Sequence, residues 1–149
     1  MLDSTITRHD GVYYRFVKGV VKGITDDQGS ALGDIFVETA PELSTPQDEW
    51  CRVAVGVTFR ASGSYPLEGP LGFRANDDSG WYFWADHFGE DHQGYVPFFS
   101  TDLSASTWDQ IEANRFELPP KTKHGVVLPL LGDEWQRLHD YSSRSVDGQ

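Results

Sequence analysis

The fold is decided by a stretch that occurs twice, first as Asp10-Gly11-Val12-Tyr13-Tyr14-Arg15-Phe16 and again as Ser79-Gly80-Trp81-Tyr82-Phe83-Trp84. In each copy a polar turn residue and a Gly precede a run of aromatic and β-branched side chains, which predicts a turn leading into a β-strand. The two copies therefore predict a repeated unit.

A second pattern repeats after the first. Glu42-Leu43-Ser44 followed by Trp50 returns as Asp102-Leu103-Ser104 followed by Trp108. Two unequal copies of the same order of elements predict an antiparallel unit of the kind that forms the four-stranded blades of a β-propeller. A β-sandwich is the alternative architecture.

Further runs rich in aromatic and β-branched residues predict additional strands. A helix is expected only near the end, where Trp135, Leu138 and Tyr141 recur every three residues. We expect an all-β domain over residues 1–141, a partial propeller of about three blades with a short C-terminal helix, followed by a polar, disordered tail over 142–149. The additional strands are expected at residues 33–38, 52–59, 94–100 and 124–130, and the helix at 133–141.

Composition narrows the class of function. Among the 149 residues, 23 acids against 12 Lys and Arg give a net charge of −11, which argues against nucleic acid and anionic membrane surfaces as partners. No run of 18 apolar residues is present, so we expect no membrane span. The aromatic content of 13% fits a β-rich core, a sugar-stacking surface or both.

The candidate chemistry centres on Tyr65-Pro66-Leu67-Glu68-Gly69-Pro70. Turns usually place acids at a solvated tip, whereas this acid is enclosed by apolar residues and prolines. A carboxyl that loses water has a raised pKa, and a raised pKa is what a general acid needs. The simpler interpretation of this stretch alone is an acid beside a tight turn.

Seven short motifs, spread over nearly the whole chain, make it resemble a known family by their order and spacing. They are Leu2-Asp3-Ser4-Thr5-Ile6, residues 10–18, Leu67-Glu68-Gly69-Pro70, residues 81–86, Gly94-Tyr95-Val96-Pro97, Ser100-Thr101-Asp102-Leu103 and residues 123–129. The chain resembles the later part of a glycoside hydrolase family 43 catalytic domain. That family forms five-bladed β-propellers, which act on arabinofuranosyl, xylosyl and related linkages.

The resemblance implies roles for three residues. Glu68 corresponds to the general acid, and Asp3 to a second Asp that tunes the pKa of the acid and orients it. His124 corresponds to a His near the propeller axis that binds a central cation, such as Ca²⁺, often through water. The family's general base lies upstream of the tuning Asp, where only Met1 and Leu2 stand here. We therefore expect the base, and about two blades, to be missing.

The activity implied is hydrolysis of α-L-arabinofuranosyl or β-xylosyl linkages in plant-type polysaccharides by inversion. This mechanism needs an acid and a base on opposite faces of the sugar, roughly 6.5–9.5 Å apart. A chain without the base is expected to be inert alone. The expected partners are an arabinose- or xylose-containing glycan and, because a partial propeller has open sheet edges, a second copy or a complementary N-terminal half.

Alternatives remain for several side chains. Trp81, Tyr95 and Phe98 are candidates for sugar stacking, although most such aromatic residues belong to a core. Asp86, at the end of an aromatic strand, is expected to be a solvated acid. The competing function is a non-catalytic glycan-binding or interaction module, which would bind sugar without releasing any.

Overall fold

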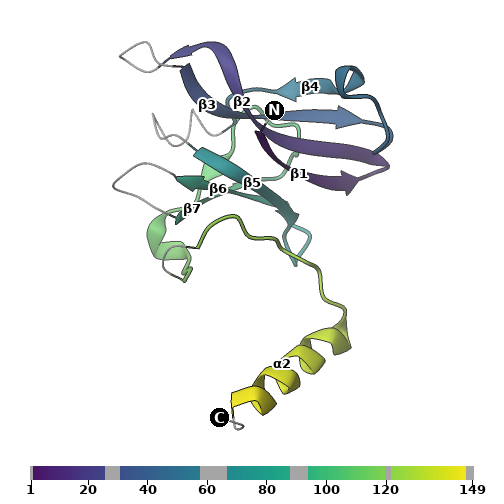
Figure 1. Cartoon of the computed structure of the whole chain (residues 1–149), viewed down its shortest axis with the longest axis vertical. Helices are drawn as coiled ribbons and strands as arrows, with labels where there is room; N and C mark the ends of the chain where they lie inside the picture. Colours follow the sequence, from purple (N-terminus) through teal and green to yellow (C-terminus); the bar gives the residue numbers. More distant parts are fainter. Residues whose placement is uncertain (1, 26–30, 58–66, 88–93, 120–121, 147–149) are drawn as a thin grey trace.

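Two four-stranded antiparallel sheets make up the body of the computed structural model (Figure 1). The structure describes residues 2–25, 31–57, 67–87, 94–119 and 122–146. The first sheet contains β1 (Leu2–His9), β2 (Val12–Thr25), β3 (Ala31–Ala40) and β4 (Cys51–Ala54), and the second contains β5 (Leu67–Arg74), β6 (Trp81–His87), β7 (Gly94–Ser100) and β8 (Asp109–Gln110). The strands of each sheet lie in chain order, which is the connectivity of a propeller blade. The all-β class and the partial propeller-like arrangement are confirmed.

The repeat seen in the sequence is a structural repeat. The first copy forms a two-residue hairpin, because Asp10 (φ 48°) and Gly11 (φ 82°) both adopt the left-handed conformation that such a turn requires. In the second copy, Ser79 and Gly80 end the longer turn between β5 and β6, and Trp81 begins β6. The later pattern also recurs, since the backbone N–H of Thr45 donates to the Glu42 carbonyl and that of Ala105 to the Asp102 carbonyl, both at 3.2 Å.

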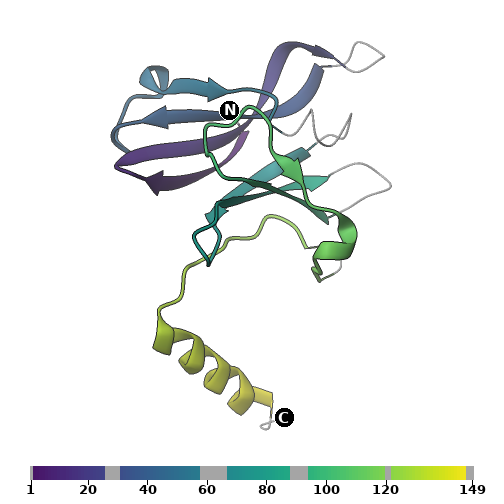
Figure 2. The same cartoon turned by 180° about the vertical axis from the view of Figure 1, so that it is seen from behind.

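The two sheets pack together through aromatic rings. Phe16 of β2 is fully buried and stacks on Phe83 of β6, with 5.0 Å between ring centroids. Trp108 meets the Phe16 ring edge-on at 5.7 Å. Gly72 of β5 makes room for the stack, because a Cβ atom there would lie 2.8 Å from the Phe16 ring. Strands β1 and β5, the first of each sheet, consequently lie side by side, as the inner strands of adjacent blades do (Figure 2).

The C-terminal part differs from the expectation. Residues 124–130 form no strand within the described part of the chain, and Val126, Leu128 and Leu131 are exposed. A strand needs a partner with which to share hydrogen bonds, and the apolar pattern alone does not supply one. The described residues therefore contain two four-stranded sheets, where about three blades were expected.

The C-terminal helix is longer than expected. Helix α2 (Gly132–Val146) includes residues 142–146, which we expected to belong to a disordered tail, while residues 147–149 lie outside the described ranges. Figures 1 and 2 show α2 standing away from the sheets at the end of an extended segment. No helix among the described residues is both long and apolar enough to cross a membrane.

Replacing Phe16 with Ala tests the contact between the sheets. We expect Phe16→Ala to lower the free energy of unfolding by about 3–5 kcal/mol, because a fully buried ring is lost from a packed core. The control Tyr141→Ala, at a side chain on α2 that is 76% exposed, should change it by less than about 0.5 kcal/mol. Urea denaturation followed by Trp fluorescence measures both, and equal losses would contradict the assignment.

Candidate active site

Glu68 lies at the start of β5, where the strand contains a bulge. It faces Asp86 of β6, and the register shifts by one residue before Leu71 pairs with Trp84. Gly69 makes this possible with a left-handed φ of 55°. A Cβ atom on Gly69 would also lie 3.0 Å from Nδ1 of His124 and 3.1 Å from Oδ2 of Asp86. The bulge therefore brings the β5 backbone close beneath these two side chains.

Glu68 forms an ion pair with Lys18 of β2. The distance from Nζ of Lys18 to Oε2 of Glu68 is 2.5 Å, and the two side chains are 13% and 24% exposed. Such a charge-assisted bond joins an ammonium group to an ionised carboxylate. A general acid must carry a proton before it can donate one, so this ion pair represents the state of Glu68 without that proton.

His124 approaches Glu68 from a distant part of the chain. Its Nε2 lies 3.8 Å from Oε1 of Glu68 and 3.5 Å from Oδ2 of Asp86. Its backbone N–H donates to Oδ2 of Asp86 at 2.9 Å. The next backbone N–H, of Gly125, donates to the hydroxyl of Tyr95 on β7. The structure thus brings together two of the predicted site residues, Glu68 and His124.

Asp86 is the residue that the sequence reasoning missed. We expected a solvated acid, but the side chain is fully buried. Burial raises the pKa of Asp86, and the charge of Glu68 raises it further, whereas the hydrogen bond from His124 and the positive charges of His124 and Lys123 act in the opposite direction. The only sequence signal was the continuous apolar run at 81–85, which predicts a strand in the core; in the structure Trp81, Phe83 and Ala85 are buried, whereas Tyr82 and Trp84 on the face of Asp86 are half-buried.

Asp3 follows Leu2, which pairs with Lys18 of β2. It is exposed on β1, at a break in the register between Leu2 and Ser4. The second carboxyl that faces Glu68 across the sheet is Asp86. The tuning role of Asp3 therefore stays a prediction, whereas Asp86 occupies the kind of position that this role requires.

Comparison with known proteins identifies the family. Residues 1–136 match a model of proteins related to glycosyl hydrolase family 43, described as "Probable glycosyl hydrolase domain". The chain belongs to this family. An alpha-L-arabinofuranosidase of Bifidobacterium longum subsp. longum is 29% identical over 128 residues, an alignment that covers 77% of this chain and 12% of the relative. The chain thus spans only a small part of that relative's length. No solved structure matches.

The predicted sugar-stacking residues of the glycosyl hydrolase domain have little or no free surface. Phe98 is fully buried and packs against Phe83, so its predicted role is wrong. Tyr95 is 7% exposed, and its hydroxyl holds the Gly125 amide. Trp81 is 6% exposed and pairs with Arg74, at the opposite end of β6 from Asp86. These three rings are packed inside the domain and leave little surface on which a sugar could stack.

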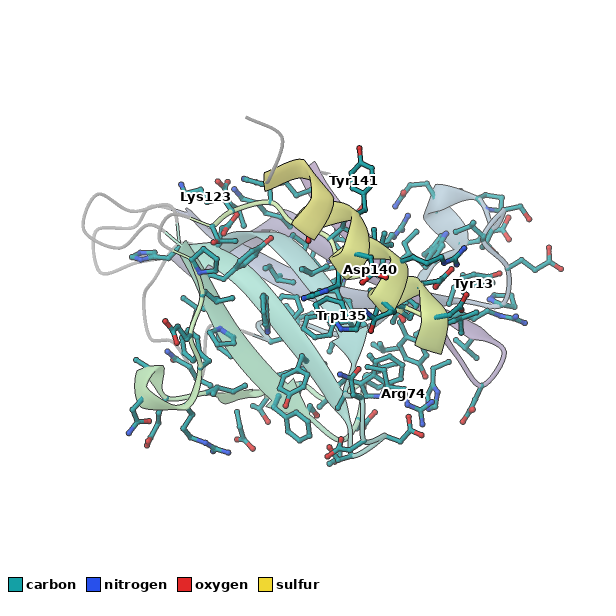
Figure 3. All side chains as sticks on the ribbon, turned by 90° about the horizontal axis from the view of Figure 1, so that it is seen from below. Tyr13, Arg74, Lys123, Trp135, Asp140 and Tyr141 are labelled. Atoms are coloured by element: carbon teal, nitrogen blue, oxygen red, sulfur yellow. The ribbon has the colours of Figure 1, made fainter. Side chains whose placement is uncertain are left out.

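The far end of the sheets contains a separate hollow. A cavity of about 770 Å³ is lined there by Arg74, Trp81, Leu128 and Trp135, among others. Figure 3 places Arg74 and Lys123, the neighbour of His124, at opposite ends of the strands, and neither Glu68 nor Asp86 lines the cavity. This cavity is therefore distinct from the cluster around Glu68.

The residues around His124 do not fit a directly bound Ca²⁺. That ion takes six to eight oxygen ligands, whereas Glu68 is paired with Lys18, and the buried Asp86 accepts the His124 amide. Within the described ranges, no group of three or more His, Cys, Asp or Glu is arranged to hold a metal ion. A cation bound near the axis through water stays a prediction.

The raised pKa of Asp86 predicts a change of stability with pH. A carboxyl with a raised native pKa binds its proton more tightly in the folded state, so its contribution to stability is present at low pH. That contribution is lost as the pH rises from the ordinary value of 3.8 through the native pKa. Urea titrations of wild type and Asp86→Asn, which cannot ionise, should show the wild-type free energy of unfolding falling relative to the variant as the pH rises above the ordinary pKa of 3.8. A constant or rising difference would contradict the burial of this charge.

Proposed function

We propose that this chain carries the proton-donating part of an active site that hydrolyses α-L-arabinofuranosyl or β-xylosyl linkages of plant-type polysaccharides with inversion. The observation that carries the proposal is the convergence of Glu68, Asp86 and His124 at one end of β5, in a chain of the glycosyl hydrolase family. Two carboxyls side by side favour the retention of one proton between them, because like charges repel.

Glu68 is the proposed general acid, which protonates the leaving oxygen. After the transfer Glu68 is a carboxylate, and the ammonium group of Lys18, 2.5 Å away, stabilises it. The ion pair is then the product state of the proton transfer rather than an obstacle to it. Asp3, on the neighbouring strand β1, is the proposed second Asp that orients the acid.

The proposed general base comes from outside this chain. Asp86 cannot serve, because a fully buried carboxylate cannot hold a water molecule on the far face of a sugar. A complementary N-terminal half is the proposed source, and association with a second copy through the open sheet edges is the other proposed assembly. An arabinose- or xylose-containing glycan is the proposed substrate, and the family membership together with the arabinofuranosidase relative supports this class.

Replacing Glu68 with Gln tests the proton donor. A general acid contributes about 10²–10⁴-fold, and the loss should appear with a phenyl α-L-arabinofuranoside, whose leaving group needs a proton. It should be far smaller with the 2,4-dinitrophenyl arabinofuranoside, whose leaving group does not. Rates of phenol release are measured with azide added as an external nucleophile, since the base is proposed to lie outside the chain.

The control for this experiment is Glu112→Gln, which removes an exposed carboxyl far along the chain. It should leave both rates unchanged. Equal rates for wild type and Glu68→Gln on the phenyl substrate would remove Glu68 from the role of acid.

A non-catalytic glycan-binding module is the second candidate. The Lys18–Glu68 ion pair favours it, because an acid held as a carboxylate donates no proton. In that case arabino- or xylo-oligosaccharides quench the Trp fluorescence while no reducing sugar appears. Turnover of the phenyl substrate that depends on Glu68 excludes this candidate.

A further inference from the structure

Two neighbouring side chains hold two consecutive backbone amides of a distant segment. Asp86 and Tyr95 pair directly across β6 and β7. Asp86 accepts the N–H of His124, and the Tyr95 hydroxyl accepts the N–H of Gly125. Because residues 124–130 form no strand within the described part of the chain, these bonds take the place of a sheet ladder in fixing the start of this segment.

The conformation that they hold is an unusual one. His124 has a φ of 46°, in the left-handed region that a residue with a Cβ seldom adopts. Such a conformation persists only where the surrounding structure enforces it, and it is found most often at functional sites. Oδ2 of Asp86 lies near both the backbone nitrogen and Nε2 of His124, at 2.9 and 3.5 Å. One carboxylate oxygen therefore fixes both the turn and the direction of the ring.

The ring is placed where it faces both Glu68 and solvent. Gly69 passes beneath it, since a Cβ atom there would lie 3.0 Å from Nδ1 of His124. On the other edge, Nε2 lies 3.8 Å from Oε1 of Glu68, and the His124 side chain is 53% exposed. The imidazole ring is thus exposed to solvent directly beside Glu68, the proposed proton donor.

Stability alone does not explain Asp86. Its Oδ1 atom is buried and has no hydrogen-bond partner among the described residues. Burying a carboxylate oxygen without a hydrogen-bond partner lowers the stability of the fold, so a role other than packing is needed to explain why an Asp stands here. Burial also raises the pKa of Tyr95, so its hydroxyl stays neutral and can accept the Gly125 amide.

We propose that Asp86 and Tyr95 are positioning residues, which clamp the His124–Gly125 turn so that the His124 ring stands over Glu68 and contacts the bound sugar. The contact with sugar rests on the proposed function. The clamp itself rests only on the geometry of β6, β7 and the segment that they hold.

Amide hydrogen exchange, measured by NMR on the whole chain, tests the clamp without any need for turnover. In the wild type the His124 and Gly125 amides should exchange slowly. Tyr95→Phe should accelerate exchange of Gly125 about tenfold, the size of one lost hydrogen bond. Asp86→Ala should do the same for His124, whereas Asp86→Asn, whose amide oxygen can still accept, should restore slow exchange. The control Tyr82→Phe removes a hydroxyl from the same sheet and should change neither amide.

The affinity for an arabino-oligosaccharide tests the consequence for the site. Tyr95→Phe and Asp86→Ala should weaken binding of the oligosaccharide, and Asp86→Asn should restore it. Recovery in Asp86→Asn is not expected if Asp86 has only a structural role. Unchanged exchange of Gly125 in Tyr95→Phe would overturn the clamp, and that variant suffices if Asp86→Ala does not fold. Absence of sugar binding by the wild type would instead count against the proposed function, and the exchange rates would still decide the clamp.

Discussion

The stacking of Phe16 on Phe83 is the contact on which the candidate site depends. Side chains alternate along a strand, so Phe16 and Lys18 point to the same face of β2. When the Phe16 ring packs against β6, it therefore directs Lys18 toward the second sheet, where it reaches Glu68. Gly72 permits this close approach by leaving the space that Phe16 fills. Core packing and the electrostatics of the site are thus coupled through one pair of strands.

The site is built mainly within the second sheet. Glu68, Asp86 and Tyr95 lie in one row across β5, β6 and β7, and the row ends beneath the turn at His124. Lys18 is the contribution of the first sheet. The proton donor Glu68 and its counter-charge Lys18 therefore belong to different blades. The second carboxyl, of Asp86, comes from the same blade as Glu68, and His124 comes from the segment that follows that blade.

The fold was largely predictable because its signals are local. The Asp10-Gly11 turn, the repeated aromatic strands and the acid-Leu-Ser turns each form within a few residues, so sequence pattern suffices to find them. The family resemblance singled out Glu68 and His124, and the structure brings the two side chains together. Asp86 was missed because its burial depends on which strand faces β6, and a bulge at Gly69 sets the pairing.

The remaining errors have the same physical origin. Aromatic residues mark a buried strand and a sugar-binding surface equally well, so the sequence alone did not place Phe98 in the core. The apolar run at 124–130 can form a strand only if another edge pairs with it. Tertiary partners, rather than propensity, decide both cases.

NMR chemical-shift mapping during titration with an arabino- or xylo-oligosaccharide tests the location of the site most directly. Within the described residues, the cluster around Glu68 and the cavity at the other end of the sheets are both candidate positions for a sugar. This account predicts that the largest shifts occur at Glu68, Gly69 and His124. Shifts confined to Arg74, Trp81 and Trp135 would place the sugar in the far cavity and contradict it.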